Sequence, residues 1–540
     1  MAPPERSSLS PDEEKGVSTF ASDKTSRSDE GVLHTDHASP VSNEEPSSSG
    51  RKYGIFAPIA AKLFDLGVES RGIERVPEDE RSDKYFWNNI LMWWSVNSSI
   101  TTLSVGILAR QTFGLSFPHA VGSILGFGII ATTLTASVAI LGPRTGLRTM
   151  IIARFSAGYV GGVVFAVFNI LTTDLIHYDS SLGFATSCVI VGGQTLASIR
   201  PDTLPLPAAI VILSVLSLIP CFIGYEAIHR TEKYTWIVLM IVMLCMWGLA
   251  ASKGFDFGVE RAQEVAEGAK GGRELAARVL SFGGVIFASF TGWAAVIADY
   301  NSRMPADTSP TKIFTMSFLG IYIPVCFTEI LGAALTAVNS PEYTQALNER
   351  GFGGLLAQVL SPWRGGGKFL LLILGLSVLT NNIVNTYSSG LSMQSLFLSG
   401  PLAKLPRFFW TLVACGIYTA AGIAGREHFA SFLANFLSIL GYWTALFIVI
   451  VMEEHFIFRR KGGRLGGYRL EEWHRVDRLP AGYAGVGAAC IGAAGAVVGM
   501  SEVWYTGPIA KLVGGRGADI GFEPPSSPFR IRRYGGWKYD

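Results

Sequence analysis

A chain of 540 residues that is 49% hydrophobic and only 16% charged is too apolar for a soluble protein of its size, because soluble domains carry about a quarter charged residues. Stretches such as 118–141 and 234–251 hold no Lys, Arg, Asp or Glu, and about 20 apolar residues suffice to cross a bilayer. The net charge of +2 says nothing about partners, but many such stretches in one chain exclude both a soluble protein and a protein with a single membrane anchor.

Residues 1–82 differ in composition from the rest of the chain. They are rich in Ser, Pro, Glu, Asp and Lys and poor in large apolar side chains, so they cannot bury enough surface to offset the entropy of ordering. Met1 opens a polar stretch rather than the apolar core of a signal peptide. We expect residues 1–82 to form a mostly disordered tail.

From Phe86 onward, apolar runs predict an all-α integral membrane protein with about twelve transmembrane helices. We place the membrane domain at residues 83–505. Residues 506–540 form an atypical segment without a clear twelfth span, since PPSSPFRIRRYGGWKYD is not apolar. The eleven clear spans cover approximately 89–112, 118–141, 158–198 (interrupted), 206–227, 234–252, 276–298, 313–337, 368–395, 407–424, 428–452 and 481–500.

The distribution of Lys and Arg predicts the orientation, because positive charge accumulates on the cytoplasmic side of membrane proteins. If the tail is cytoplasmic, the inner loops hold most of the basic residues. The long outer loop after the fifth span also contains basic residues, but acidic residues accompany them. We therefore expect a cytoplasmic N-terminus. The basic residues of the inner loops would be Arg144, Arg148, Arg154, Arg230, Lys233, Arg303, Lys312, Lys404, Arg407 and Arg459–Lys461.

Polar side chains gather inside two spans that we expect to be broken. Such residues compete with the backbone for hydrogen bonds and weaken a helix, and unwound backbone is tolerated only where it lines protein or water. In the sixth span, Ser289, Thr291 and Gly292 precede Trp293. Broken first and sixth spans indicate two five-helix repeats of opposite topology with a site near the midplane. The polar residues of the first span are Asn88, Asn89, Ser95, Asn97, Ser98, Ser99, Thr101 and Thr102.

The eighth span adds a second polar cluster, Asn381, Asn382, Asn385 and Thr386. An asparagine offers both donor and acceptor groups, and an aromatic ring offers a stacking face. Together they suit a flat, neutral heteroaromatic ligand better than an ion or a lipid. The alternative is that the asparagines only hydrogen-bond neighbouring helices.

Two acidic residues at membrane depth are candidates for proton coupling, because coupling requires a titratable group. Glu329 lies inside the seventh span and Asp299 at the end of the sixth. The alternative for Asp299 is a helix cap or an ion pair with Arg303.

Other chemical signals are weak. We interpret Glu453–His455 as a solvated helix end and the scattered cysteines as small buried hydrophobes. The sequence contains no nucleotide-binding loop, nucleophile motif or zinc signature. We therefore expect neither an enzyme nor an ATP-driven pump, and neither a cofactor, a metal site nor a nucleic-acid partner.

Seven stretches also resemble motifs of a known family: FWNNILMWWSVN, GPRTGLRTMIIARFSAGY, VIVGGQTL, FTGWAAVIADYNSRMP, TEILGAAL, LTNNIVNTYSSGLSMQ and SEVWYTGPIAKLVGGRGADIGFE. Between about Asp83 and Phe522 the chain is similar to the fungal purine–cytosine permeases of the nucleobase–cation symporter family. The resemblance implies a twelve-helix inverted-repeat fold and proton-coupled uptake of nucleobases across the plasma membrane.

The same resemblance implies a set of substrate-binding positions. Two of them depart from the family pattern: the amide expected four residues after Phe184 is Cys188, and Val384 replaces a proline. The implied positions are Ser95, Asn97, Phe184, Cys188, Trp293, Asn381, Asn382 and Val384.

These departures leave other functions open. A thiol in place of an amide removes a donor–acceptor pair, which leaves another heterocycle such as uracil, allantoin or a vitamin-like ring as an alternative substrate. A non-transporting sensor or a decayed paralogue is a further alternative, which Cys188 and the missing twelfth span favour. The insertion TDLIHYDSS at 173–181 also interrupts the third span.

Overall fold

The computed structural model describes residues 57–65, 68–69, 71–81, 83–174, 183–201, 203–269, 272–397, 399–460, 465–515 and 517–522. They belong to one compact unit, Pro46–Asp540. Most of the tail that we expect to be disordered lies outside the described residues.

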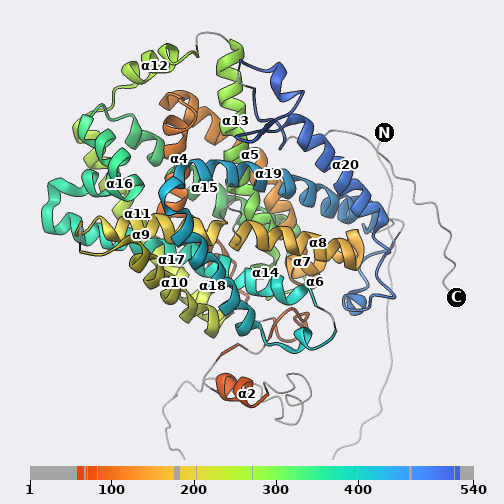
Figure 1. The fold of residues 1–540 in the computed structure, drawn as a ribbon. Coiled ribbons are helices and arrows are strands. Elements are labelled where there is room, and N and C mark those ends of the chain that lie inside the picture. The colour runs from red at the N-terminus through yellow and green to blue at the C-terminus, as the bar shows by residue number, and fades with distance from the viewer. Residues whose placement is uncertain are drawn as a thin grey trace, which may run out of the picture. The chain divides into compact units, whose positions relative to one another are not determined.

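Helices account for nearly all of the described structure (Figure 1). Nine of them are long and apolar enough to cross a membrane, and α9 and α20 are shorter apolar helices. The helices that correspond to the expected spans are α3 (Phe86–Asn97) and α4 (Ile100–Gln111), α5 (Phe117–Ala139), α8 (Arg154–Asp174) and α9 (Phe184–Ala197), α10 (Leu206–Ile223), α11 (Tyr225–Lys253), α13 (Gly272–Thr291) and α14 (Ile297–Asn301), α15 (Pro310–Thr336), α17 (Arg364–Ser395), α18 (Arg407–Gly425), α19 (Phe429–Glu453) and α20 (Tyr483–Gly499).

Shorter elements lie at the two ends of this bundle. Figure 1 shows α12 (Phe257–Ala266) and α16 (Pro341–Leu360) at the left, and α6 (Leu141–Thr145) and α7 (Thr149–Ile152) at the right. We call these the α16 end and the α7 end. After α20 comes a hairpin of β1 (Ser501–Glu502) and β2 (Tyr505–Thr506), antiparallel with Ser501 opposite Thr506.

The expected breaks in the first and sixth spans are present. Helix α3 ends at Asn97, and Ser99 is extended (φ −114°, ψ 157°) before α4 begins. Helix α13 ends at Thr291, a 3-10 turn follows at Gly292–Ala295, and α14 begins at Ile297. These breaks occupy equivalent places in the two five-helix halves.

Side chains of α17 satisfy the backbone groups that the first break releases. The hydroxyl of Ser377 accepts from the Ile100 amide at 3.2 Å, and the Thr380 hydroxyl donates to the Ser95 carbonyl at 3.2 Å. A broken helix at membrane depth requires such partners, since no water is available there. The break is therefore a stable part of the fold.

The third span is divided between α8 and α9, as the insertion predicts. Within α8 the chain kinks at Gly158, whose φ of 68° is left-handed and therefore suits a residue without a side chain. Residues 175–181 of the insertion lie outside the described residues.

The boundary that we expect at residue 83 is too late. Residues 71–81 pack against the end of α6 and Gly146 after it: the Val76 amide donates to the Gly146 carbonyl at 2.8 Å, and Arg75 donates to the Thr145 carbonyl at 2.9 Å. Arg81 is buried and donates to the Pro143 carbonyl. Composition averaged over 82 residues hides this short segment, because its contacts are made by polar groups.

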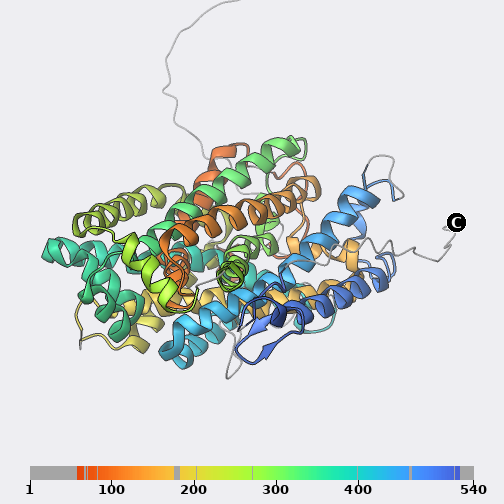
Figure 2. The same cartoon turned by 90° about the horizontal axis from the view of Figure 1, so that it is seen from above.

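The C-terminal segment that we expect to be atypical is packed as far as Phe522; residues 523–540 lie outside the described part. The Phe522 ring contacts Phe127 and Phe287, with centroids 5.8 and 5.3 Å apart. Figure 2 shows α20 and the hairpin along one side of the bundle.

The interpretation of Glu453–His455 as a solvated helix end is wrong for two of its three residues. Glu454 is buried and pairs with Arg459 at 2.9 Å, and His455 is buried against Tyr468 with 3.2 Å between Nδ1 and the hydroxyl. The segment 465–470 folds back against this helix end, where the Leu465 amide donates to the Phe458 carbonyl and the Tyr468 ring stacks on His455.

Candidate functional site

Three of the expected site residues meet at the two helix breaks. The indole of Trp293, in the 3-10 turn of the sixth span, donates to the Asn97 amide oxygen at 3.0 Å. The same indole stacks on Phe184 of α9, with centroids 5.9 Å apart and planes 17° apart. The Trp93 ring packs edge-on against Trp293, with centroids 5.3 Å apart.

The spacing of this stacked pair sets a condition on any flat ligand. Atoms in van der Waals contact lie about 3.5 Å apart, so a ring held between two parallel rings requires about 7 Å. The ring centroids of Phe184 and Trp293 lie 5.9 Å apart, so their planes are no farther apart than this. A ligand must therefore part the two rings by at least about 1 Å or stack on one outer face.

A polar group adjoins the aromatic pair and contains two more expected residues, Cys188 and Asn381. The Cys188 thiol donates to the Asn381 amide oxygen at 3.4 Å and accepts from the Thr101 hydroxyl at 3.4 Å. The same Asn381 oxygen accepts from the Asn385 amide at 2.6 Å. The Asn381 amide group donates to the Val96 carbonyl at 3.3 Å, so this residue links α9, α17 and the broken first span.

Sequence reasoning did not assign Thr101 and Asn385 to the site. Both lie in the polar runs of their spans, and Asn381 and Asn385 are four residues apart on one helix. Residues at this spacing lie on the same helix face, which is the signal that could have found Asn385.

Three expected residues lie differently from this group. The Asn382 amide donates to the hydroxyls of Ser217 and Tyr418 at 2.8 and 3.4 Å, so it joins α17 to α10 and α18. Val384 is buried, and its carbonyl accepts from the Tyr300 hydroxyl at 2.8 Å. The Ser95 side chain is buried beside Glu232 of α11.

Glu329 is completely buried on α15. One carboxyl oxygen accepts from the Ser289 hydroxyl of α13 at 2.7 Å, and the other has no hydrogen-bond partner among the described residues. Helix α15 packs tightly against α4 here: a Cβ on Gly106 would lie 1.9 Å from the Glu329 carbonyl, and one on Gly332 would lie 2.1 Å from the Leu103 carbonyl. The carboxyl group thus lies where the first, sixth and seventh spans meet.

Asp299 adopts the capping alternative. Its carboxylate accepts from the backbone amide and the hydroxyl of Thr149 at 2.7 and 3.1 Å, at the start of α7. The Arg148 guanidinium donates to the Asp299 carbonyl at 2.7 Å. Arg303 pairs instead with Glu69, at 2.6 Å.

Glu69 is a buried acid that sequence reasoning missed, because it stands in a charged segment with no motif. At the α7 end its second oxygen accepts from the Tyr387 hydroxyl at 3.1 Å and lies 3.5 Å from Arg407. Burial alone would raise the pKa of this carboxyl, but Arg407, Arg303 and Arg148 lower it below its usual value. The segment before the first span thereby ties α17 and α18 to the end of the sixth span.

Within the described residues, no group of three or more His, Cys, Asp and Glu side chains is arranged to hold a metal ion. The central site therefore consists of aromatic faces, amides, hydroxyls and one thiol.

Comparison with known proteins identifies the family. The family of permeases for cytosine/purines, uracil, thiamine and allantoin matches residues 75–513. The chain is 36% identical to the purine-cytosine permease fcyB of Emericella nidulans, covering 87% of this chain and 88% of that one. It is 30% identical to the vitamin B6 transporter TPN1 of Saccharomyces cerevisiae, covering 92% and 93%.

A solved structure confirms the expected fold. The chain resembles Mhp1, a nucleobase-cation-symport-1 family transporter in a closed conformation with bromovinylhydantoin bound, with a TM-score of 0.55 and 14% identity over 76% of this chain and 83% of that one. This likeness supports the five-plus-five transporter fold with broken first and sixth spans. Together with the match over residues 75–513, these relatives show that the chain belongs to the family of permeases for cytosine/purines, uracil, thiamine and allantoin.

Proposed function

We propose that this permease is a secondary transporter that couples the uptake of a nucleobase, cytosine or a purine, to protons at the plasma membrane. The observation that carries the proposal is the stacked pair Phe184–Trp293 beside the amide of Asn381. A flat ring needs an aromatic face for its plane and donor–acceptor groups for its edge. The α7 end and the tail would face the cytoplasm.

Within this proposal the expected residues take different roles. Phe184 and Trp293 stack on the ring, while Asn97, Cys188 and Asn381 face its edge; Ser95 supports the break. Asn382 and Val384 hold α17 against its neighbours, and Asp299 caps α7. Glu329 carries the coupled proton.

Cys188 supports a second candidate substrate, vitamin B6, which one relative is named for transporting. The thiol supplies one weak donor where an amide would supply a donor and an acceptor. A ring whose edge does not pair with an amide at position 188 loses less by this exchange.

Uptake of labelled cytosine, adenine and vitamin B6 in a host that lacks its own carriers tests the function. We expect uptake of cytosine or adenine that rises with external acidity and collapses with a protonophore. Uptake of vitamin B6 alone would favour the second candidate. Correctly inserted protein that takes up none of the three would contradict transport of these heterocycles.

Replacing Cys188 by asparagine should strengthen nucleobase binding, because the site gains an amide next to Asn381. Each new hydrogen bond contributes about 1 kcal/mol, so we expect about five- to thirtyfold tighter binding of cytosine or adenine for one or two bonds. Competition against labelled uptake measures the change. Cys188→Ala is the matched control and should gain nothing.

The insertion could displace this helix face, so the substitution is also made in a chain that lacks Thr173–Ser181. Improvement in the shortened chain alone would identify the insertion as the cause of weak binding. No improvement in either chain would show that residue 188 does not face the substrate.

Replacing Glu69 by alanine should loosen the α7 end. Arg407 would lose its carboxylate partner while remaining buried, and a buried charge without a partner is strongly unfavourable. Arg407 also donates to the Cys221 carbonyl at 2.9 Å, and Cys221 is fully buried. We expect maleimide labelling of Cys221 to be about tenfold faster in this variant, which corresponds to about 1.4 kcal/mol. Mass spectrometry of the labelled peptide measures it.

Exposed Cys490 provides the internal reference for this labelling, and its rate should not change. Equal labelling of Cys221 in both proteins would show that Glu69 does not hold this end closed.

A further inference from the structure

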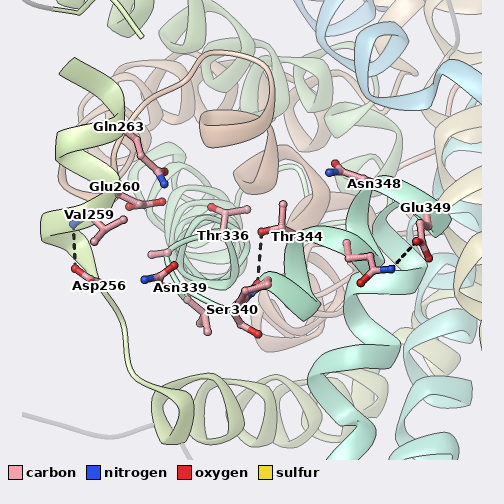
Figure 3. Close-up of a pocket in the computed structure, with 14 residues that line it drawn as sticks. Asp256, Val259, Glu260, Gln263, Thr336, Asn339, Ser340, Thr344, Asn348 and Glu349 are labelled. Atoms are coloured by element: carbon pink, nitrogen blue, oxygen red, sulfur yellow. Dashed lines mark hydrogen bonds between the residues drawn. The ribbon is translucent and has the colours of Figure 1, made fainter. Parts of the chain in front are cut away.

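A cavity lies at the α16 end, away from the central site. It has a volume of about 530 Å³ and is bounded by α12 on one side and α16 on the other (Figure 3). Ligand pockets in proteins usually measure about 300–1,000 Å³, so this cavity can hold a small heterocycle.

The wall of this cavity is acidic and rich in acceptors. Three carboxylates line it, those of Asp256, Glu260 and Glu349, and its described lining includes no Lys, Arg or His. The carboxylates of Asp256 and Glu349 already have partners, the Val259 amide and Gln345. The hydrogen-bond partners of the third carboxylate, Glu260, therefore decide whether the cavity can bind a donor.

Glu260 is 5% exposed and has one oxygen without a hydrogen-bond partner. Its other oxygen accepts from the Phe117 amide at 2.8 Å. Figure 3 shows the side chain pointing from α12 into the cavity. A buried acceptor without a donor is unfavourable, and a small rotation of this side chain would present the oxygen to a donor in the cavity.

The charged groups around α12 do not supply that donor. Arg110 pairs with Glu267 at 2.6 Å, and Glu264 accepts from the Ser116 amide and lies 3.0 Å from His119. Burial raises the pKa of Glu260 to about 7, because the Phe117 amide and Arg110 offset it only in part.

We propose that this cavity is a second binding site, which takes an amino-bearing heterocycle before it reaches the central site, with the amino group donating to Glu260. The amides of Asn339 and Asn348 can pair with the ring edge, and Val338 and Pro341 offer apolar surface to its face. An anion is excluded by the three carboxylates. The inference rests on the proposed function and adds a second binding site for the same class of substrate.

Binding to the purified full-length protein tests the inference, with Asn381→Ala present to weaken the central site. The probe is labelled adenine, and the analogue that lacks only the amino group is purine. We expect adenine to bind the Asn381→Ala protein, purine to bind at least fivefold more weakly, and Glu260→Gln to weaken adenine at least fivefold. Glutamine keeps a carbonyl oxygen for the Phe117 amide, so the α12 contact is retained.

Glu264→Gln is the matched control, since Glu264 also contacts the start of α5 but does not line the cavity. It should leave adenine binding unchanged. Asn348→Ala on the opposite wall gives an independent test if Glu260→Gln folds poorly, and it should weaken adenine at least threefold.

Measurements of adenine uptake distinguish failure of the second site from failure of the proposed function. Uptake of adenine by Glu260→Gln should show a raised KM and an unchanged maximal rate. Two results would overturn the second site and leave the proposed function intact, provided that the wild-type protein transports adenine. In the first, the Asn381→Ala protein does not bind adenine. In the second, it binds adenine equally well when Glu260→Gln is added. A wild-type protein that neither binds nor transports adenine or cytosine would overturn the proposed function, and with it the second site.

Discussion

Transport of cytosine or adenine by the Asn381→Ala variant is expected to fall by about 100-fold in the ratio of maximal rate to KM. The amide of Asn381 can exchange its present partners, Cys188, Asn385 and the Val96 carbonyl, for the edge of a bound ring. Losing two hydrogen bonds of about 1.4 kcal/mol each corresponds to about 100-fold. Uptake at several substrate concentrations, normalised to protein at the cell surface, measures the effect.

Asn382→Ala is the matched control, because the neighbouring amide contacts Ser217 and Tyr418 rather than Cys188. We expect lower thermal stability of the purified protein but an apparent affinity within about threefold of the wild type. An equal loss of affinity in both variants, or none in Asn381→Ala, would contradict the assignment.

The contrast between these two asparagines shows how far the sequence could define the site. A polar run in an apolar span predicts a helix that faces protein or water, and the predicted breaks follow from that. Phe184, in contrast, is implied only by the family resemblance, and the sequence does not predict its stacking on Trp293. Successive residues on a helix point about 100° apart, so Asn381 and Asn382 face different neighbours. Which of the two faces the centre depends on the rotation of α17 about its axis, and its packing against α9 and α10 sets this rotation.

Asp299 and Glu69 show a second limit. The sequence predicts that a buried acid needs a partner, but the partners come from segments 150 or more residues away: Thr149 for Asp299, and Arg303 and Arg407 for Glu69. Glu69 belongs to a segment whose composition is that of a disordered chain. Only tertiary packing shows that its carboxylate is buried among arginines.

Glu329→Gln should abolish proton-driven accumulation while leaving a functional permease. Glutamine has nearly the same shape as glutamic acid and can still accept from the Ser289 hydroxyl, which lies 2.7 Å from the present carboxyl oxygen, but it cannot release a proton. One proton moving down a gradient of one pH unit supplies about 1.4 kcal/mol, which corresponds to about tenfold accumulation. In the variant we expect an accumulation ratio near one at every external pH.

Exchange of labelled for unlabelled substrate across the membrane separates coupling from simple inactivity. Exchange does not require net proton movement, so Glu329→Gln should exchange substrate at a rate within about threefold of the wild type while losing its response to acidity and to a protonophore. Asp299→Asn is the control: it removes a charged cap from α7, which costs about 1 kcal/mol of stability, but should leave the pH response intact. If Asp299→Asn loses that response and Glu329→Gln keeps it, the coupled proton is carried at the α7 end. In the opposite outcome the coupled proton is carried by Glu329, beside Ser289 of α13, where Gly106 and Gly332 let α15 pack closely against α4 of the broken first span.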